Sequence, residues 1–237
     1  MKMQGLYNGF SYWGNGNGVF ILGDTHFADQ DLKDAYPMRP SDEELVKRIN
    51  SKAGKNSTLI ILGDVGDVSY VRKLRAARKI LILGNHDLGS TKYKRDITFK
   101  QYDVKIWSKQ EAMKDMEELY PGWNLSCSLS YGGSHWVIIA DNNLFDEVYA
   151  GPLMISEKIL LSHEPISNCS WVCNCHAHVH DIHAKDDAYH FNFNIDSKQH
   201  YEPWNFNQWL KEGHTSKIQS LHRQTIDSAT ERKRKRK

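Results

Sequence analysis

The sequence has no long apolar run. None of its 237 residues lies in a stretch that approaches the roughly 20 consecutive apolar residues of a membrane-spanning helix. The first residues also lack the apolar centre of a secretory signal peptide, because they lead into a polar segment rich in Gly and Asn. We therefore expect a cytoplasmic protein without a membrane partner.

Cysteine is scarce, with only Cys127, Cys169, Cys173 and Cys175 in the chain. Three of them are close together, but their C-x3-C-x-C spacing lacks the paired CxxC pattern of structural zinc sites. On an extended segment Cys173 and Cys175 share one face, and a free cysteine packs as a small hydrophobe. We predict that this cluster packs in the core and does not bind a metal.

A broad basic surface is missing as well. The formal net charge is +2, but residues 232–237 are all basic, and residues 1–231 hold 25 Lys and Arg against 29 Asp and Glu, a net charge of −4. A mildly acidic body argues against a protein that coats DNA. We expect residues 232–237 to form a disordered basic tail, with contact to nucleic acid as the alternative.

The remaining composition is that of one soluble globular domain over residues 1–231. Hydrophobic residues make up 40% and charged residues 25% of the chain, which is enough apolar material for a sizeable core. The length suits one large domain, and no segment has the composition of a linker.

Three short apolar runs each end in Gly followed by Asp or Asn. They are residues 19–22 before Gly23-Asp24, 58–62 before Gly63-Asp64, and 79–83 before Gly84-Asn85. Continuous apolar runs of this length are typical of strands buried on both faces. Helical segments separate the runs, and the first begins at Ser41, a helix cap with Glu44 three residues later. This alternation predicts an α/β fold with a parallel sheet, whose strand ends bring the polar side chains together.

The other elements are predicted less specifically. Residues 5–18 are expected to form a loop or a loose hairpin, and a short basic helix is expected at about 69–77. The remaining predictions are helices at 110–120 and 204–210 and strands at 136–140, 158–161 and 189–195.

Histidines gather in one stretch near the middle of the chain. His163, His176, His178 and His180 lie within 18 residues. Several imidazoles at ligand spacing are hard to explain without a metal. We therefore expect a metal site that these histidines share with the Asp and Asn residues of the upstream strand ends.

Taken together, these motifs resemble the calcineurin-like metallophosphoesterase superfamily in order and spacing over residues 23 to 180. They are Asp24-x-His26, Gly63-Asp64, Gly84-Asn85-His86-Asp87, His163 and His178-x-His180. Arg39-Pro40 and Ser162-His163-Glu164-Pro165 are similar to a small type found in phages and bacteria. The resemblance implies a four-layer α/β/β/α sandwich with a dinuclear metal site at the strand ends. For a phage-encoded protein it also implies the host cytoplasm.

The resemblance further implies which residues hold the metals. Asp24, His26 and His180 would hold the first metal, Asn85, His163 and His178 the second, and Asp64 would bridge the two. Two divalent metals about 3.5–4 Å apart can hold a hydroxide for in-line attack on a phosphoryl group. Oxygen and imidazole ligands suit Mn, Fe, Ni or Zn, and we expect Mn to be the most active in vitro.

Four further residues are candidates for catalysis or substrate binding. His86 follows a ligand by one position, so it is our candidate for the general acid. Asp87 would either orient His86 or cap a helix. Arg39, from the resemblance, and His176, two residues before a ligand, are candidates for substrate contact. The superfamily usually has Gly where Ala177 stands, so we expect the loop either to avoid a strongly positive φ at this residue or to accept some strain.

The predicted substrate is a small phosphodiester, most simply of the nucleotide type. Protein phosphatases of this superfamily carry an arginine after the second motif, where this chain has Gly66-Asp67-Val68-Ser69. A phosphomonoester dianion needs more positive charge around it than a diester does. A nuclease, a phosphomonoesterase and a non-catalytic binding module remain alternatives. Variable loops, here 5–18, 27–40, 88–108 and 141–156, would shape the substrate pocket.

Overall fold

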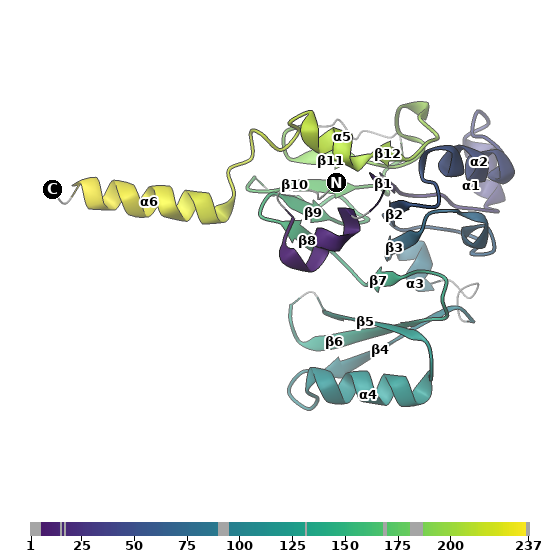
Figure 1. Ribbon diagram of the computed structural model, residues 1–237, viewed down its shortest axis with the longest axis horizontal. Helices are drawn as coiled ribbons and strands as arrows, with labels where there is room; N and C mark the ends of the chain where they lie inside the picture. Colours follow the sequence, from purple (N-terminus) through teal and green to yellow (C-terminus); the bar gives the residue numbers. More distant parts are fainter. Residues whose placement is uncertain are drawn as a thin grey trace.

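Two β-sheets packed face to face form the centre of the molecule (Figure 1). The computed structural model describes residues 6–14, 16, 18–89, 95–130, 132–167, 170–180 and 187–235. The first sheet has the strand order β12-β1-β2-β3-β7. Its strands are β1 (Gly18–Leu22), β2 (Ser57–Ile61), β3 (Arg78–Ile82), β7 (Glu147–Tyr149) and β12 (Trp204–Asn205). β1, β2, β3 and β7 run parallel, which confirms the parallel sheet predicted from the three apolar runs.

The second sheet has the order β11-β10-β9-β8. Its strands are β8 (Leu153–Ser156), β9 (Ile159–Leu161), β10 (Cys173–His176) and β11 (His190–Asn192). Cys173 and Cys175 are buried between the sheets beside apolar residues of β1, β2 and β3, so their predicted core packing is confirmed. Cys169 lies outside the described residues.

Helices cover the outer faces of this sandwich. α1 (Gln30–Ala35) and α2 (Asp42–Lys52) follow β1, and α2 buries Leu45 and Ile49 against the first sheet. Ser41 caps α2 by accepting a hydrogen bond from the Glu44 backbone N–H, as the sequence predicts. α5 (Phe206–Lys211) packs against the aromatic residues that follow and form β11. The α/β class and the layered metallophosphoesterase-type architecture are therefore those expected.

A third sheet was not predicted as a separate unit. β4 (Ile97–Asp103), β6 (His135–Asp141) and β5 (Asn124–Leu129) form an antiparallel sheet, with α4 (Lys109–Leu119) on one face. Ala112 and Met116 of α4 pack on this face, while Val137 and Ile139 point from the other face toward the main body. Figure 1 shows this unit below β7. We call residues 97–141 the appended sheet.

Two predicted elements are wrong. The helix predicted over 69–77 is replaced by a 3-10 turn, η2 (Val71–Lys73). After this turn the chain is extended, because Leu74 and Ala76 are both buried in the core and the Arg75 N–H between them donates to the side chain of Asn50. Residues 5–18 contain the 3-10 helix η1 (Asn8–Gly14) in place of a plain loop or hairpin. It forms because Trp13 is buried and its indole N–H bonds to Glu147.

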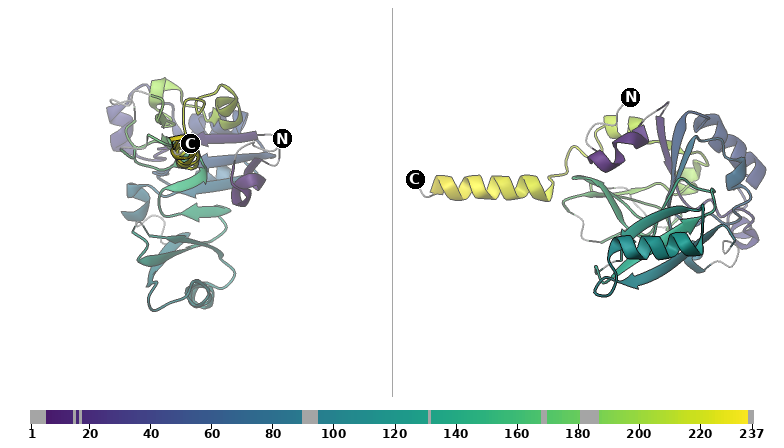
Figure 2. Two further views of the ribbon diagram at one scale, coloured as in Figure 1. Left: turned by 90° about the vertical axis from the view of Figure 1, so that its left-hand side faces the viewer. Right: turned by 60° about the horizontal axis from the view of Figure 1, so that its bottom comes forward.

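The C-terminal helix α6 (Leu221–Lys235) extends away from the rest of the molecule (Figures 1 and 2). Residues 232–235, which we expected in a disordered tail, form its last turn. None of the residues of α6 is buried, so the helix has no core packing to stabilise it. No described helix is both long and apolar enough to cross a bilayer.

The remaining short elements are α3 (Asn85–Gly89), which directly follows the third strand end, and η4 (Ser197–Gln199), which follows β11. α3 matters most for the site, because it begins at a predicted ligand.

Candidate metal centre

The ends of five strands bring the predicted ligands together. The loops after β1, β2 and β3 carry Asp24, His26, Asp64 and Asn85, and those after β9 and β10 carry His163, His178 and His180. Within the described residues, two groups have the geometry to hold a metal ion, with candidate ligand atoms within 4.8 Å of one another. One group is Asp24, His26 and His180, and the other is Asp64, His163 and His178.

Asp64 lies between the two groups. Its Oδ2 is 3.6 Å from Nε2 of His26 and 3.3 Å from Nε2 of His163. The other oxygen, Oδ1, accepts a hydrogen bond from the His86 backbone N–H, which fixes the carboxylate. One oxygen therefore faces the imidazoles of both groups, as a bridging ligand requires.

Lone-pair atoms converge in the second group. Nε2 of His163 lies 3.0 Å from Nδ1 of His178 and 2.9 Å from Oδ1 of Asn85. A cation coordinated by these atoms would use the lone pairs of all three. Two imidazole nitrogens and one amide oxygen are suitable ligands for a divalent transition metal.

Asp24 presents an oxygen that the protein leaves unsatisfied. Its Oδ2 accepts a hydrogen bond from the His178 backbone N–H at 2.7 Å. Its Oδ1 is buried and has no hydrogen-bond partner among the described residues, and it lies 3.8 Å from Nε2 of His26. Because a buried carboxylate oxygen without a partner is costly, this atom fits a metal ligand.

Three of the histidines are oriented through their other ring nitrogen. Nδ1 of His26 lies 3.1 Å from Oδ2 of Asp29, and Nδ1 of His180 lies 2.7 Å from Oδ2 of Asp196. Nδ1 of His163 donates to the Leu62 carbonyl at 2.8 Å. Such contacts set the tautomer and aim Nε2 at a metal.

Asp29 and Asp196 were not among the predicted site residues. Asp29 lies three residues after His26, a spacing that could have been noticed. Asp196 follows β11 and has no motif around it, so only the fold brings it to His180.

Arg39 lies behind the ligands. Its side chain is buried, forms an ion pair with Asp196 and donates to the backbone carbonyls of Asp24 and Thr25. The resemblance had suggested a place near the substrate. In the structure the guanidinium instead holds the first ligand loop and the carboxylate that orients His180.

His86 and Asp87 face different surroundings. His86 is exposed, and its ring lies edge-on to that of His26 with the centroids 5.3 Å apart, at the rim of the site. Asp87 is buried, and its carboxylate accepts the backbone N–H groups of Asp64, Val65 and Gly84 at 2.8–3.0 Å. Asp87 therefore ties the two ligand loops together.

His176 is buried at the end of β10, with its ring centroid 6.3 Å from that of His190. It is not in either ligand group, and its Nδ1 lies 3.1 Å from the carbonyl oxygen of Ala177.

Backbone strain is concentrated at the candidate ligands. Nine residues other than Gly have a positive φ in the described chain, and five of them are Asp24, His26, Asp64, His178 and His180. A non-glycine residue adopts this conformation at a cost, and such strain clusters at functional sites. The fold therefore holds these side chains at positions that the local backbone disfavours.

Glycines at the strand ends serve two different purposes. Gly63 has a φ of 81°, a conformation that glycine adopts without the steric cost of a side chain. Gly23 does not have a positive φ, but a Cβ there would lie 2.3 Å from Cβ of Ala177. The methyl group of Ala177 occupies this space, and its φ is not positive, which is the first of the two expected alternatives.

The carboxylates create a strongly negative site. Burial acts to lower the pKa of His163, but the hydrogen bond to Asp64 and the charges of Asp24 and Asp64 raise it to about 9. Burial acts in the same way on His26, whose pKa is nevertheless raised by Asp24, Asp64 and Asp29. The potential that stabilises an imidazolium also stabilises a divalent cation, which would replace the proton.

Comparison with known proteins assigns the chain to a family. The model of the calcineurin-like phosphoesterase family matches residues 19–227. The chain belongs to this family. The family assignment implies metal-dependent phosphoester hydrolysis, and the candidate ligand groups fit two divalent metals.

Other comparisons add little. No curated protein matches the chain. A solved structure, the protein of unknown function AQ665 from Aquifex aeolicus, is similar over 82% of this chain and 98% of its own, with 20% sequence identity and a TM-score of 0.47.

Proposed function

We propose that this calcineurin-like phosphoesterase is a phosphodiesterase that uses two divalent metals. The observation that carries the proposal is the position of Asp64 Oδ2, which faces His26 of one ligand group and His163 of the other. A shared carboxylate oxygen is what keeps two cations close together. When bound, the metals would activate water and neutralise charge on the phosphoryl group.

The protein's own residues supply orientation and a proton. Asp29, Asp196 and the Leu62 carbonyl hold three imidazoles in place, while Asp87 fixes the loop that carries Asp64. His86 is exposed beside His26, where its ring can reach a leaving oxygen and protonate it.

The surroundings favour a diester over a monoester. A cavity of about 260 Å³ adjoins Asn85 and His163, and its described lining contains no Lys or Arg. Arg39, the arginine expected near the substrate, is engaged with Asp196. A singly charged diester therefore suits the site better than a doubly charged monoester.

The direct test compares bis-p-nitrophenyl phosphate with p-nitrophenyl phosphate in the presence of Mn²⁺. We expect a higher kcat/KM for the diester, and loss of about 10³-fold in kcat for Asp64→Asn, because several kcal/mol of metal-derived stabilisation disappears. Asp67→Asn is the matched control. It makes the same change in the same loop, but the Asp67 carboxylate accepts the Ser69 N–H.

Two outcomes would contradict the proposal. If the wild-type protein hydrolyses neither ester with any divalent metal, the proposed phosphoesterase activity is wrong. A higher kcat/KM for the monoester would instead replace the phosphodiesterase by a phosphomonoesterase.

A further inference from the structure

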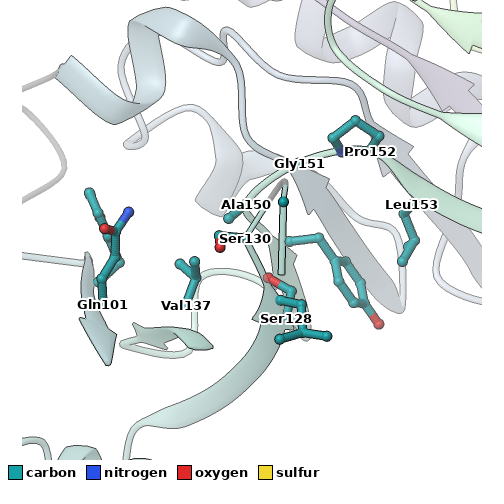
Figure 3. Close-up of a pocket in the computed structure, with 12 residues that line it drawn as sticks. Gln101, Ser128, Ser130, Val137, Ala150, Gly151, Pro152 and Leu153 are labelled. Carbon is teal, nitrogen blue, oxygen red and sulfur yellow. The ribbon is translucent and has the colours of Figure 1, made fainter. Parts of the chain in front are cut away.

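A cavity of about 550 Å³ lies between the appended sheet and the main body (Figure 3). One side is the face of the appended sheet that carries Gln101, Val137 and Ser128, and the other is the segment 149–153, which links β7 to β8. This volume is within the range of small-molecule sites. The metal centre does not account for the cavity, since none of its lining residues is a candidate ligand.

The floor of the cavity is a row of side chains across the three strands. Gln101 pairs with Val137, and Val137 pairs with Ser128, so the three side chains stand on one face of the sheet. Figure 3 shows them opposite residues 150–153. The row places an apolar side chain between an amide and a hydroxyl.

Ser128 provides an unused hydrogen-bonding group. Its Oγ is buried and has no partner among the described residues. A buried hydroxyl without a partner costs free energy, and its burial leaves the exposed Gln101 amide as the accessible hydrogen-bonding side chain of this row.

The cavity shares one wall with the smaller cavity beside the proposed active site. Residues 150–152 line it, and the same residues line the smaller cavity beside Asn85 and His163. The segment 150–152 therefore lies between the metal centre and the appended sheet, next to both cavities.

The lining also restricts what can bind. None of its described residues is charged, so neither a second phosphate nor a polynucleotide backbone finds a counter-charge there. Phe99, with 43% of its surface exposed, and Tyr149 supply aromatic surface. Aromatic surface beside the exposed Gln101 amide suits a planar, uncharged group whose edge carries hydrogen-bond donors and acceptors.

We propose that this cavity binds the nucleobase of a small nucleotide diester and thereby selects the substrate. The proposal rests on the proposed phosphodiesterase activity and names its substrate class. The metal centre would bind the phosphate of any diester, whereas the cavity would bind the nucleobase of a nucleotide diester.

Two diesters that differ only in the base test this selection. They are the methyl ester of adenosine 5′-phosphate and the same methyl ester of 1-O-methylribose 5-phosphate, with hydrolysis followed by ³¹P NMR in Mn²⁺. We expect kcat/KM for the base-bearing diester to be about tenfold higher or more. A ratio near one would overturn the proposal.

Gly151→Phe tests the location. Gly151 lines both cavities, no atom lies within 4 Å of a Cβ added there, and its φ is not positive, so a large side chain can start at this position and occupy space next to both cavities. We expect the ratio of the two kcat/KM values to fall toward one. The ratio is the readout because any effect on the shared metal chemistry cancels in it.

Gly9→Phe is the matched control. A Cβ at Gly9 also meets no atom within 4 Å, but the residue lies on η1 and lines neither cavity. We expect it to keep the wild-type ratio. A Gly151→Phe variant with the wild-type ratio would place base recognition elsewhere and overturn the proposal.

Binding of adenosine separates this proposal from the proposed activity. Ligand-detected NMR should show adenosine binding to wild type and Gly9→Phe, and at least fivefold weaker binding to Gly151→Phe. If adenosine binds in this way but the protein hydrolyses no diester, base binding in the cavity is supported and the proposed phosphodiesterase activity is wrong. If the protein hydrolyses bis-p-nitrophenyl phosphate but shows neither adenosine binding nor a preference for the base-bearing diester, the phosphodiesterase activity is supported and base binding in the cavity is wrong.

Discussion

Two buried aspartates follow buried strands in different parts of the molecule. Asp64 follows β2 in the main body, and Asp141 ends β6 in the appended sheet. Burial acts to raise the pKa of Asp64, but the hydrogen bond to His163 and the charges of His163 and His26 lower it. Burial raises the pKa of Asp141 to about 6, because hydrogen bonds from Phe145 and Leu144 only partly oppose it.

The difference shows what an apolar run followed by Asp can become. Both segments look alike in sequence, but imidazoles surround only Asp64. Asp141 accepts two backbone N–H groups through Oδ1, and its buried Oδ2 has no partner in the described chain. Asp64 is a candidate metal ligand, whereas Asp141 accepts hydrogen bonds within a turn at a cost in stability.

Displacing Asp64 should have the largest effect. A Cβ at Gly84 would lie 2.2 Å from Oδ1 of Asp64, so Gly84→Ala must move this carboxylate. We expect kcat on bis-p-nitrophenyl phosphate to fall about 100-fold, because a shift of about 1 Å is enough for such a loss. Gly54→Ala is the control, since no atom lies within 4 Å of the added methyl group. Full activity of Gly84→Ala would show that the position of Asp64 is not critical.

Removing a supporting charge should have a smaller effect. Asp29 contacts His26 through Oδ2 and caps α1 through Oδ1, and Asn is an equally good helix cap. Asp29→Asn should therefore fold normally but bind Mn²⁺ about tenfold more weakly in calorimetric titration. Asp31→Asn, an exposed change in the first turn of the same helix, is the control. Unchanged affinity for Asp29→Asn would mean that this carboxylate does not support the site.

Asp141→Asn should change stability and leave the chemistry intact. The folded state holds the Asp141 proton more tightly than the unfolded chain does, so this group reduces stability as pH rises from about 4 to about 6. Above that range the penalty is constant, and the variant should be more stable than wild type by up to about 3 kcal/mol.

Urea unfolding at pH 4 and pH 7 measures this difference. At pH 4 the carboxyl group is largely protonated in the folded state, so the two proteins should be similar there. If the variant is less stable than wild type at pH 7, the hydrogen bonds to the charged carboxylate stabilise the turn at residues 141–145 by more than the free energy that its burial costs.

The positions of the candidate ligands follow mainly from local sequence. A short apolar run, a glycine and a polar residue define each strand end, and parallel strands place such ends on one edge of a sheet. This is why Asp24, Asp64 and Asn85 could be named before the fold was known. The helices at Ser41 and 110–120 were also predictable, because caps and period are local signals.

The contacts that hold the candidate ligands in place could not be predicted from local sequence. Asp196 reaches His180 and Arg39 only after β11 joins the second sheet. Arg39 looked like a free cation for the substrate, but a buried guanidinium needs partners, and the fold supplies them. The predicted helix at 69–77 failed for a related reason, since burial of alternate residues outweighed helix propensity.

By itself, then, the sequence determined the parallel strands, the residues that follow them and the family to which the chain belongs. The tertiary structure decided which buried carboxylate faces imidazoles, where Arg39 is paired and how the appended sheet encloses a cavity beside the site. The physical reason is that strand ends and caps depend on neighbours along the chain. Charge and cavity shape depend on residues that only folding brings together.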